Sequence, residues 1–244
     1  MSEAVELSVV VPVHNEAGNA ANLAREIANA LEGRAFEMIF VNDASTDQTV
    51  EELVEARESL PQLRILSHRQ NSGQSRAIRS GVRAARAPVV ATLDGDGQND
   101  PADLPELYRQ LTRHDAAADL AMVMGRRAKR QDTAWKRFGS RFANNIRQKL
   151  LKDGCDDSGC GIKAIRREVF LELPYFDHMH RYMPALINAE GYKAEYVDVN
   201  HRGRMHGVSK YTNFGRLWAA FSDLRGVTWL MKRRRLPGGV DEVR

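Results

Sequence analysis

The sequence predicts an α/β protein, with a single Rossmann-like domain whose mostly parallel sheet is flanked by helices. Short apolar segments recur through the first half of the 244-residue chain, and each is followed by a stretch with helical spacing. Polar loops, several containing glycine, follow these apolar segments. Such loops are typical of sheets that bind ligands beyond the carboxyl ends of their strands.

The elements follow in order from this pattern. Leu7–Val13 is rich in β-branched residues and almost wholly apolar, as expected of a strand buried on both faces. Apolar residues at helical spacing then predict a helix that ends before Gly33. The alternation continues, with strands expected at 36–41, 63–67, 88–93 and 119–124 and helices at 48–58, 74–85 and 101–113. Repeated units of this kind form a parallel sheet with right-handed crossovers.

The alternation weakens after residue 125. The pattern there predicts a basic helix at about 134–151, a Gly-rich stretch at 154–161, a helix near 181–190 and a strand at 194–199. No linker or internal repeat separates the two halves. We therefore expect one domain over 1–212, with halves of about 1–125 and 126–212, then an amphipathic helix with a basic end at 213–236 and a flexible tail at 237–244.

The composition excludes several classes of protein. With 43% hydrophobic and 28% charged residues and a mean hydropathy of −0.48, the chain is neither disordered nor fibrous. It has no apolar run of about 18 residues, and Glu3 and Glu6 stand where a signal peptide would carry cations. We expect a cytoplasmic protein. Its two cysteines, Cys155 and Cys160, are too few for a structural zinc site and are expected to be reduced thiols.

The net charge of +4 hides an uneven distribution. Residues 1–120 contain 11 Arg, no Lys and 19 acidic residues, whereas residues 121–244 contain 25 Lys plus Arg and 13 acidic residues. The basic half is expected to meet a polyanion, such as anionic lipid headgroups, a phosphorylated substrate or nucleic acid. The alternative is a solvated basic surface.

Two carboxylates follow the fourth predicted strand, in the sequence Asp94-Gly-Asp96-Gly. Neighbouring glycines let the backbone bend until both carboxylates serve one site. Mg²⁺ takes few protein carboxylates and leaves its other positions to water and phosphate oxygens, so this pair suits a nucleotide diphosphate site. The alternative is an Asp/Gly turn. Asp100 before Pro101 is instead typical of a helix N-cap.

Further polar side chains end the first two strands. Asp43 is placed to accept hydrogen bonds from the edge of a base, whereas Asp47 is equally well explained as a helix cap. Glu16 is expected to face the same cleft, and His14 to be either a ligand contact or a wall residue.

These residues resemble the inverting glycosyltransferases of the GT-A fold, and among them the polyprenyl-phosphate sugar synthases such as dolichol-phosphate mannosyltransferase. The resemblance covers about residues 7–212 and rests on Pro12-Val-His-Asn-Glu16, Asn42-Asp-Ala-Ser-Thr-Asp47, Asn71-Ser-Gly-Gln74 and Asp94-Gly-Asp-Gly-Gln98. It implies a nucleotide-binding first half, with the nucleotide sugar held by Pro12, His14, Glu16, Asp43, Asp47, Gln74 and Asp94. It also implies a catalytic Mg²⁺ or Mn²⁺ held by Asp94, Asp96 and Gln98, with Arg126 bordering the sugar pocket. At His14 many members carry an aromatic hydroxyl instead.

Two later segments resemble the acceptor side of that family. One is Asp156-Asp-Ser-Gly-Cys-Gly-Ile-Lys163, in which Asp157 is expected to orient the acceptor or the sugar; roles as a base or as a turn residue stay open. The other is His201–Tyr211. Its residues Arg202, Arg204, Ser209 and Lys210 suit a phosphate cradle, or alternatively a solvated basic loop.

The expected function is therefore sugar transfer from a UDP- or GDP-linked donor to a polyprenyl phosphate, at the cytoplasmic face of a membrane. A transferase of the same fold acting on a soluble sugar or a cell-envelope glycan such as lipopolysaccharide is the alternative. A nucleotidyltransferase would need a basic Gly-rich loop near the first strand, which residues 13–22 lack. Nucleic acid is not an expected partner, because no reading module is recognisable.

Peripheral attachment to the membrane surface is expected from two aromatic stripes with neighbouring cations. The first stripe comprises Trp135, Phe138, Phe142 and Ile146; the second comprises Phe214, Trp218, Phe221 and Leu224 and leads to Lys232–Arg235. The alternative is that both stripes pack on the sheet or against another subunit of a homo-oligomer.

Overall fold

A computed structural model describes residues 4–127, 147–155, 157–200, 202–203, 213–237 and 242, with only the backbone for 213–220. Its seven strands form one sheet in the order β3-β2-β1-β4-β6-β5-β7. Their bounds are β1 Leu7–Val13, β2 Phe36–Asn42, β3 Leu63–Ser67, β4 Val89–Thr92, β5 Leu120–Arg127, β6 Lys163–Arg166 and β7 Lys193–Val199. The mostly parallel sheet predicted from the sequence is confirmed.

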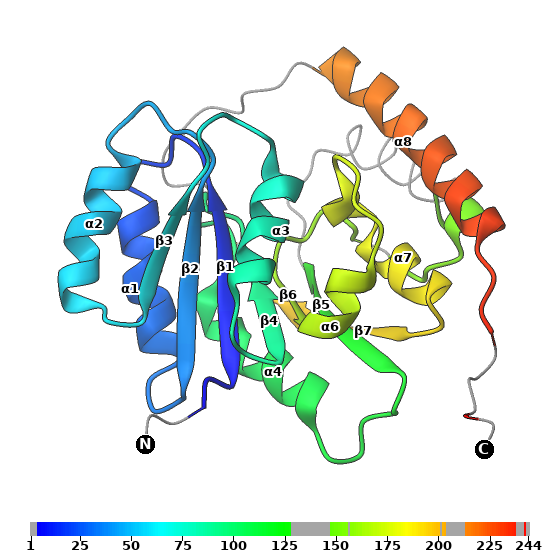
Figure 1. Ribbon diagram of the computed structural model, residues 1–244, viewed down its shortest axis with the longest axis horizontal. Coiled ribbons are helices and arrows are strands. Elements are labelled where there is room, and N and C mark those ends of the chain that lie inside the picture. The colour runs from blue at the N-terminus through cyan, green and yellow to red at the C-terminus, as the bar shows by residue number, and fades with distance from the viewer. Residues whose placement is uncertain are drawn as a thin grey trace.

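Helices cover both faces of this sheet (Figure 1). α3, α6 and α7 lie on one face, and α1, α2 and α4 on the other. Their bounds are α1 Ala20–Ala30, α2 Thr49–Ser59, α3 Gln74–Ala84, α4 Leu104–Thr112, α6 Arg167–Glu172, α7 Met183–Ala189 and α8 Asn213–Arg233, with short 3-10 turns η1 Pro101–Asp103 and η2 Met179–Arg181. Because the sheet is covered on both sides, β1, β2 and β4 are buried at every position.

The parallel half of the sheet matches the sequence-based expectation closely. β1 pairs in parallel with both β2 and β4, and Val13 lies beside Asn42 at the carboxyl end. The polar loops that follow these strands therefore start at one edge of the sheet. Asp100 accepts a 3.0 Å hydrogen bond from the backbone N–H of Ala102, which confirms the helix cap before Pro101.

Strand β6 and helix α6 were not expected from the sequence. β6 contains only four residues, KAIR, and both of its ends are charged, so it lacks the apolar run that revealed the other central strands. It pairs antiparallel with β4 and with β5. As a result Lys163, the first residue of β6, lies beside Thr92 near the carboxyl end of β4.

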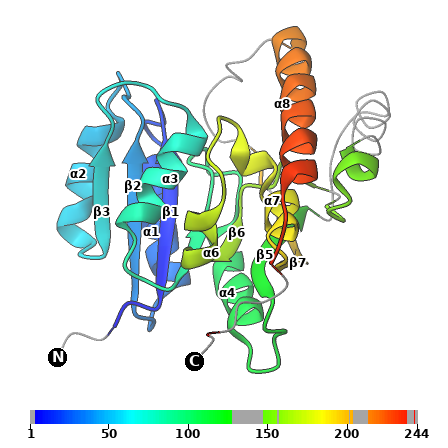
Figure 2. The same ribbon diagram turned by 45° about the vertical axis from the view of Figure 1, so that its right-hand side comes forward.

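Helix α8 packs along the side of the molecule that carries α7, away from α1 and α2 (Figure 2). His178 Nδ1 lies 2.9 Å from an Asp223 carboxylate oxygen, and Arg234 pairs with Glu190 just beyond α7. Within the part of the chain that the structure describes, no helix is long and apolar enough to cross a membrane. Most of the basic helix predicted at 134–151 lies outside the described residues, although 147–151 is helical.

Candidate active site

The site lies where the carboxyl ends of β1, β2 and β4 meet. Gly95, after β4, packs directly on β1: a Cβ there would lie 2.8 Å from the Pro12 carbonyl oxygen and 2.7 Å from a Val13 methyl. His14 Nδ1 donates to the Asp43 carbonyl oxygen at 2.8 Å, which ties the loop after β1 to the loop after β2. Pro12 itself is buried in β1. The motifs Pro12–Glu16, Asn42–Asp47 and Asp94–Gln98 therefore lie side by side and form one continuous wall of the cleft.

Asp43 is almost completely buried and organises the third motif. Its Oδ1 accepts hydrogen bonds from His68 Nδ1 at 2.7 Å and from the Ser72 backbone N–H at 2.9 Å. Its Oδ2 accepts from the Gly73 N–H at 2.8 Å. Asp43 thus fixes the turn that leads into α3. The base of a bound nucleotide could contact this carboxylate only next to the three groups that already donate to it.

Glu16 and Asp47 hold the loops around this wall. Asp47 accepts from the backbone N–H and hydroxyl of Thr49, at 3.1 and 2.5 Å, and from the Ala17 N–H at 3.1 Å. Burial raises the pKa of Asp47, but these hydrogen bonds outweigh it and leave the pKa below its ordinary value. Glu16 accepts from the Asn19 side chain at 3.0 Å. Both carboxylates thus make local contacts that shape the entrance to the cleft.

The motif Asn71–Gln74 and the motif Asp94–Gln98 meet at the side chain of Asp94. Gln74, the first residue of α3, donates from its side-chain amide to Asp94 Oδ1 at 2.7 Å. On the other side, Gly161 approaches so closely that a Cβ would overlap Oδ2 of Asp94. In the same loop, Asp96 Oδ1 accepts from the Gln98 backbone N–H at 3.2 Å. Asp94 is therefore held rigidly between α3 and the segment that precedes β6.

A buried ammonium group lies behind Asp94. Lys163 is 3% exposed and its Nζ donates to the Cys160 carbonyl oxygen. Burial raises the pKa of Asp94 and the charge of Asp96 adds to that rise, whereas Lys163 opposes it. Burial likewise lowers the pKa of Lys163, and Asp94 opposes that fall. Lys163 and Asp94 thus each favour the charged form of the other inside the protein, against the effect of burial.

The Asp157 side chain is held by Arg127. This arginine directly follows Arg126, which is predicted to border the sugar pocket. Arg127 Nε and Nη2 donate to the two carboxylate oxygens at 2.6 and 2.5 Å, and the Arg127 backbone N–H lies 3.2 Å from one of them. Both side chains are largely buried. The neighbouring Arg126 instead faces the surface, where it donates to Asp198 at 2.7 Å.

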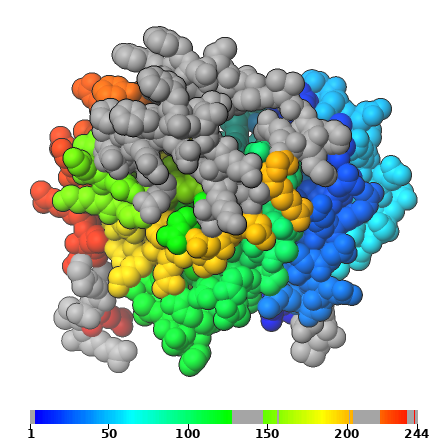
Figure 3. All heavy atoms as spheres, turned by 180° about the vertical axis from the view of Figure 1, so that it is seen from behind, coloured from blue at the N-terminus to red at the C-terminus, as the bar shows by residue number. Residues whose placement is uncertain are grey.

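The first part of the predicted phosphate cradle lies against the acidic loop. The Arg202 backbone N–H donates to the Gln98 carbonyl oxygen at 3.0 Å, and its guanidinium bridges Glu26 and Asp100 at 2.5 and 2.6 Å. Figure 3 shows this gold segment on the surface beside the blue first helices. Arg202 is thus already engaged with carboxylates. Arg204, Ser209 and Lys210 lie outside the described residues.

The residues around Asp94 fit a divalent cation that is bound together with a diphosphate. Among the described residues, no group of three or more His, Cys, Asp and Glu side chains forms a complete protein metal site. Asp94, Asp96 and the amide of Gln98 supply only hard oxygen ligands. Mg²⁺ and Mn²⁺ accept such incomplete sets when phosphate oxygens fill the other positions.

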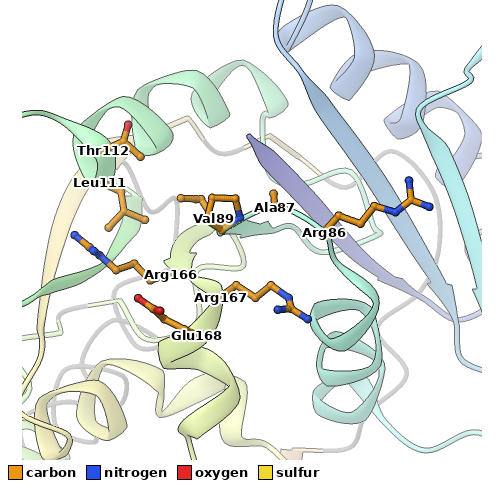
Figure 4. Close-up of a pocket in the computed structure, with 9 residues that line it drawn as sticks. Arg86, Ala87, Val89, Leu111, Thr112, Arg166, Arg167 and Glu168 are labelled. Carbon is orange, nitrogen blue, oxygen red and sulfur yellow. The ribbon is translucent and has the colours of Figure 1, made fainter. Parts of the chain in front are cut away.

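A cavity of about 420 Å³ occurs at the opposite edge of the sheet (Figure 4). It is lined by Val89, at the start of β4, and by Arg166, Arg167 and Glu168, where β6 leads into α6. Asp94 follows the other end of β4. This cavity therefore contains none of the predicted site residues and is separate from the cleft.

The sequence reasoning missed three residues that shape the site: Lys163, Gly161 and Arg127. The first two lie in the segment Asp156–Lys163, which was singled out for Asp157 alone. A lysine at the start of a strand that is too short to detect gives no sequence signal of burial. Arg127 pairs with a residue 30 positions away, and only the pairing of β5 with β6 explains that contact.

The sequence and fold relationships agree with this geometry. Residues 8–173 match Glycosyl transferase family 2. The chain is 33% identical to the dodecaprenyl-phosphate galacturonate synthase of Rhizobium johnstonii, across 97% of this chain and 70% of that protein. It is 36% identical to the undecaprenyl-phosphate 4-deoxy-4-formamido-L-arabinose transferase of Pseudomonas aeruginosa, across 84% of this chain but only 60% of that protein.

The fold also matches the glucosyl-3-phosphoglycerate synthase of Mycobacterium tuberculosis, solved with Mn²⁺, uridine diphosphate and glucosyl-3-phosphoglycerate. The TM-score is 0.69 at 17% identity, covering 96% of this chain and 82% of that one. The GT-A fold expected from the sequence is thereby confirmed. With this fold, and with the family motifs gathered at the carboxyl edge of its sheet, the chain belongs to glycosyltransferase family 2.

Proposed function

We propose that this glycosyltransferase moves a sugar from a nucleoside diphosphate to a polyprenyl phosphate, with inversion at the anomeric carbon. The observation that carries the proposal is the fixed position of Asp94, held by Gln74 and covered by Gly161 beside the buried Lys163. A carboxylate so constrained at the end of a buried strand suits a donor diphosphate bound through a metal ion.

The donor end of the cleft is assigned to the loops after β1 and β2. Asp43 lies next to the turn at Gly73, and His14 is hydrogen-bonded to the Asp43 backbone. A uracil or guanine edge would meet this wall, with Glu16 and Asp47 keeping the entrance loops in place. The diphosphate would then extend along the amino end of α3 towards Asp94, where the helix dipole favours negative charge.

Asp94, Asp96 and Gln98 are the residues that would hold Mg²⁺ or Mn²⁺. When bound, such an ion supplies positive charge that neutralises the departing nucleoside diphosphate. The chain itself contributes rigid placement, because Gln74 and Gly161 leave the Asp94 carboxylate little freedom. Pre-arranged ligands of this kind need no reorganisation during the reaction. The related mycobacterial structure holds Mn²⁺ with uridine diphosphate, which supports this assignment.

The acceptor is proposed to bring its own nucleophile. A phosphate monoester has a second pKa of about 6, so at neutral pH it is mostly dianionic and needs no strong general base. The protein then has to align a phosphate oxygen with the anomeric carbon on the face opposite the leaving group. Asp157, held by Arg127, is placed to orient the sugar or the acceptor. Arg126, the preceding residue of β5, would border the sugar pocket from the surface, where it pairs with Asp198.

A lipid-linked acceptor would place the reaction at a membrane surface. The relatives from Rhizobium and Pseudomonas are named for dodecaprenyl and undecaprenyl phosphates, which supports a polyprenyl phosphate here. The basic residues Arg202, Arg204 and Lys210, together with the hydroxyl of Ser209, suit the acceptor phosphate. The cytoplasmic face is the proposed location, since nucleotide sugars are made in the cytoplasm.

The full chain should be assayed with UDP- and GDP-sugars, with Mg²⁺ or Mn²⁺, and with a short-chain prenyl phosphate as acceptor. We expect a prenyl-phosphate sugar whose anomeric configuration, read by NMR, is opposite to that of the donor. Chelation with EDTA should abolish product formation. Transfer to a free sugar or a glycan, with none to any prenyl phosphate, would contradict the proposed acceptor while leaving the donor site intact.

A further inference from the structure

A row of three hydrogen-bonded side chains joins Asp43 to helix α3. Nδ1 of His68 lies 2.7 Å from Asp43 Oδ1, and Nε2 of the same imidazole lies 2.9 Å from Ser80 Oγ. The first two residues directly follow β2 and β3, and the third belongs to α3. We call this set the Asp43–His68–Ser80 triplet.

The fold fixes each member of the triplet. The His68 backbone N–H donates to the Asn42 carbonyl oxygen at 2.8 Å, so the paired ends of β2 and β3 carry the imidazole. Helix α3 packs over β1 and β2 (Figure 2), and a Cβ at Gly81 would overlap a methyl group of Val10. Because the helix approaches the sheet so closely at Gly81, the neighbouring Ser80 has a fixed position relative to His68.

The contacts of the imidazole define which of its nitrogens carries the proton. An ionised carboxylate only accepts hydrogen bonds, so Nδ1 of His68 is the protonated nitrogen facing Asp43. In the neutral ring Nε2 is then an acceptor, and the Ser80 hydroxyl donates to it. Ser80 thus selects the tautomer that donates to Asp43 and prevents the ring from turning away.

The Asp43 carboxylate has little acceptor capacity left. A carboxylate oxygen accepts about two hydrogen bonds. Oδ1 already accepts two, from His68 Nδ1 and from the Ser72 backbone N–H. Oδ2 accepts from the Gly73 N–H at 2.8 Å, which is its only donor among the residues that the structure describes. One acceptor position is therefore open, and it lies on Oδ2.

We propose that His68, positioned by Ser80, determines which base the donor site accepts. With one position open on Asp43, the site suits a base whose edge presents a single N–H between two carbonyl groups, as uracil does. Guanine presents two neighbouring donors, N1–H and the N2 amino group. One of them would stay unpaired beside a side chain that is only 5% exposed, which lowers affinity. This inference rests on the proposed function, because it takes the wall at Asp43 as the place where the base binds.

The test is calorimetric titration of the full chain with UDP, GDP and pyrophosphate, each with Mg²⁺. We expect wild-type protein to bind UDP at least about tenfold more tightly than GDP, as for one unpaired hydrogen bond. His68→Ala should lose about tenfold or more in UDP affinity, because Asp43 loses the group that orients it. Its preference for UDP over GDP should also shrink, since Oδ1 gains an open position. Pyrophosphate has no base and should bind equally well to both proteins.

Conservative variants separate positioning from folding. An Asn side chain can place an N–H where Nδ1 lies, whereas Gln places it where Nε2 lies. His68→Asn should therefore keep much of the UDP affinity, and His68→Gln should resemble His68→Ala. Ser80→Ala should weaken UDP binding by about threefold. Ser8→Ala is the matched control, because its buried hydroxyl donates to Glu37 at 2.8 Å near the amino end of β1; its nucleotide binding should be normal.

Sugar-transfer kinetics separate this inference from the proposed function. His68→Ala should raise the donor KM and leave kcat nearly unchanged, because the residue acts on a group remote from the reacting bond. The inference is overturned, even where a prenyl phosphate is glycosylated, by tighter binding of GDP than UDP to wild-type protein. An equal loss of UDP and pyrophosphate affinity in His68→Ala, or an unchanged UDP affinity there, would also overturn it. If the affinities change as expected but no prenyl phosphate is glycosylated, the proposed function fails and this inference stands.

Discussion

Arg127 holds Asp157 through both carboxylate oxygens, at 2.6 and 2.5 Å, in a largely buried ion pair. The hydrogen bond to Asp157 raises the pKa of Arg127 still further above its already high ordinary value. A carboxylate clamped in this way is suited to accepting a hydrogen bond from a substrate hydroxyl and so positioning it, and poorly suited to collecting a proton. This geometry favours the orienting role over the base role.

Asp157→Asn should therefore reduce kcat without moving the acid limb of the pH–rate profile. It should also destabilise the fold by roughly 3 kcal/mol, because Arg127 is left buried beside a neutral partner. Urea titration measures this loss, and Arg127→Met should show a similar one. The double variant Arg127→Met, Asp157→Leu should lose less stability than the two single variants combined. A shifted acid limb in Asp157→Asn would instead assign the base role to this residue.

Asp96→Asn should lower kcat/KM by at least about a hundredfold while the protein stays folded, since it removes a charge that is needed at the departing diphosphate. Asp100→Asn is the control in the same loop, because Asp100 only caps η1 and pairs with Arg202. That control should cost about 1 kcal/mol of stability or less and retain most of the activity. Full activity in the Asp94→Asn, Asp96→Asn double variant would remove the metal assignment.

Gly161→Ala should impair the enzyme although glycine takes no part in the chemistry. The new methyl group would overlap Asp94 Oδ2 and lie 2.6 Å from Asn99 Oδ1, so the carboxylate would have to move. Weaker donor binding in the presence of Mg²⁺ or Mn²⁺, measured by calorimetry, is the expected result. Gly203→Ala is a suitable comparison, because no atom of the residues that the structure describes lies within 4 Å of a Cβ at that position. Equal donor affinity in both variants would show that the loop adapts.

His180 should make the fold sensitive to mild acid. Its Nδ1 lies 2.7 Å from Ser75 Oγ, and burial, followed by the charge of Lys163, holds its pKa well below the ordinary value of 6.5. The unfolded chain therefore binds a proton below pH 6.5 that the folded protein refuses, so stability falls as the pH drops through that range.

Protonation of this one residue lowers the free energy of unfolding by up to about 1.4 kcal/mol for each pH unit within that range. Thermal unfolding followed between pH 7 and pH 5 would measure it. His180→Asn, which can keep a hydrogen bond to Ser75, should flatten the decline. An unchanged slope in that variant would assign the acid sensitivity to other groups.

Arg202 offers a test of the acceptor cradle with two opposite outcomes. If its guanidinium binds the acceptor phosphate, it must exchange Glu26 or Asp100 for that ligand. Arg202→Ala should then raise the KM for prenyl phosphate about tenfold, as expected for a lost charge-assisted hydrogen bond. Glu26→Gln should lower the KM slightly, because it removes a competing carboxylate.

Arg204→Ala should likewise raise the acceptor KM and leave nucleotide binding nearly unchanged. Weakened nucleotide binding with normal acceptor kinetics, in either arginine variant, would place these residues on the donor side.

The parallel half of the fold was predictable because its strands are buried on both faces and therefore appear as apolar runs, as in Leu7–Val13. Positions such as Asp43 and Asp94 were predictable because they follow those runs directly. Lys163 was not, since the carboxylate that opposes the fall in its pKa, Asp94, follows a different strand, β4. The contacts of the Asp43 carboxylate were also hidden, because its donors, His68, Ser72 and Gly73, lie 25 to 30 residues further along the chain, in the segment between β3 and α3.

The reversed direction of β6 has a consequence for how this enzyme could diversify. Because the strand runs against its neighbours, the chain enters it at the catalytic edge and leaves it at the far edge, beside the cavity at Arg166. We therefore expect mutations in the incoming segment, up to Lys163, to affect the proposed active site, and mutations just after Arg166 to affect packing at the cavity. Selection can therefore change specificity and stability through two adjoining stretches of sequence that lie at opposite edges of the sheet.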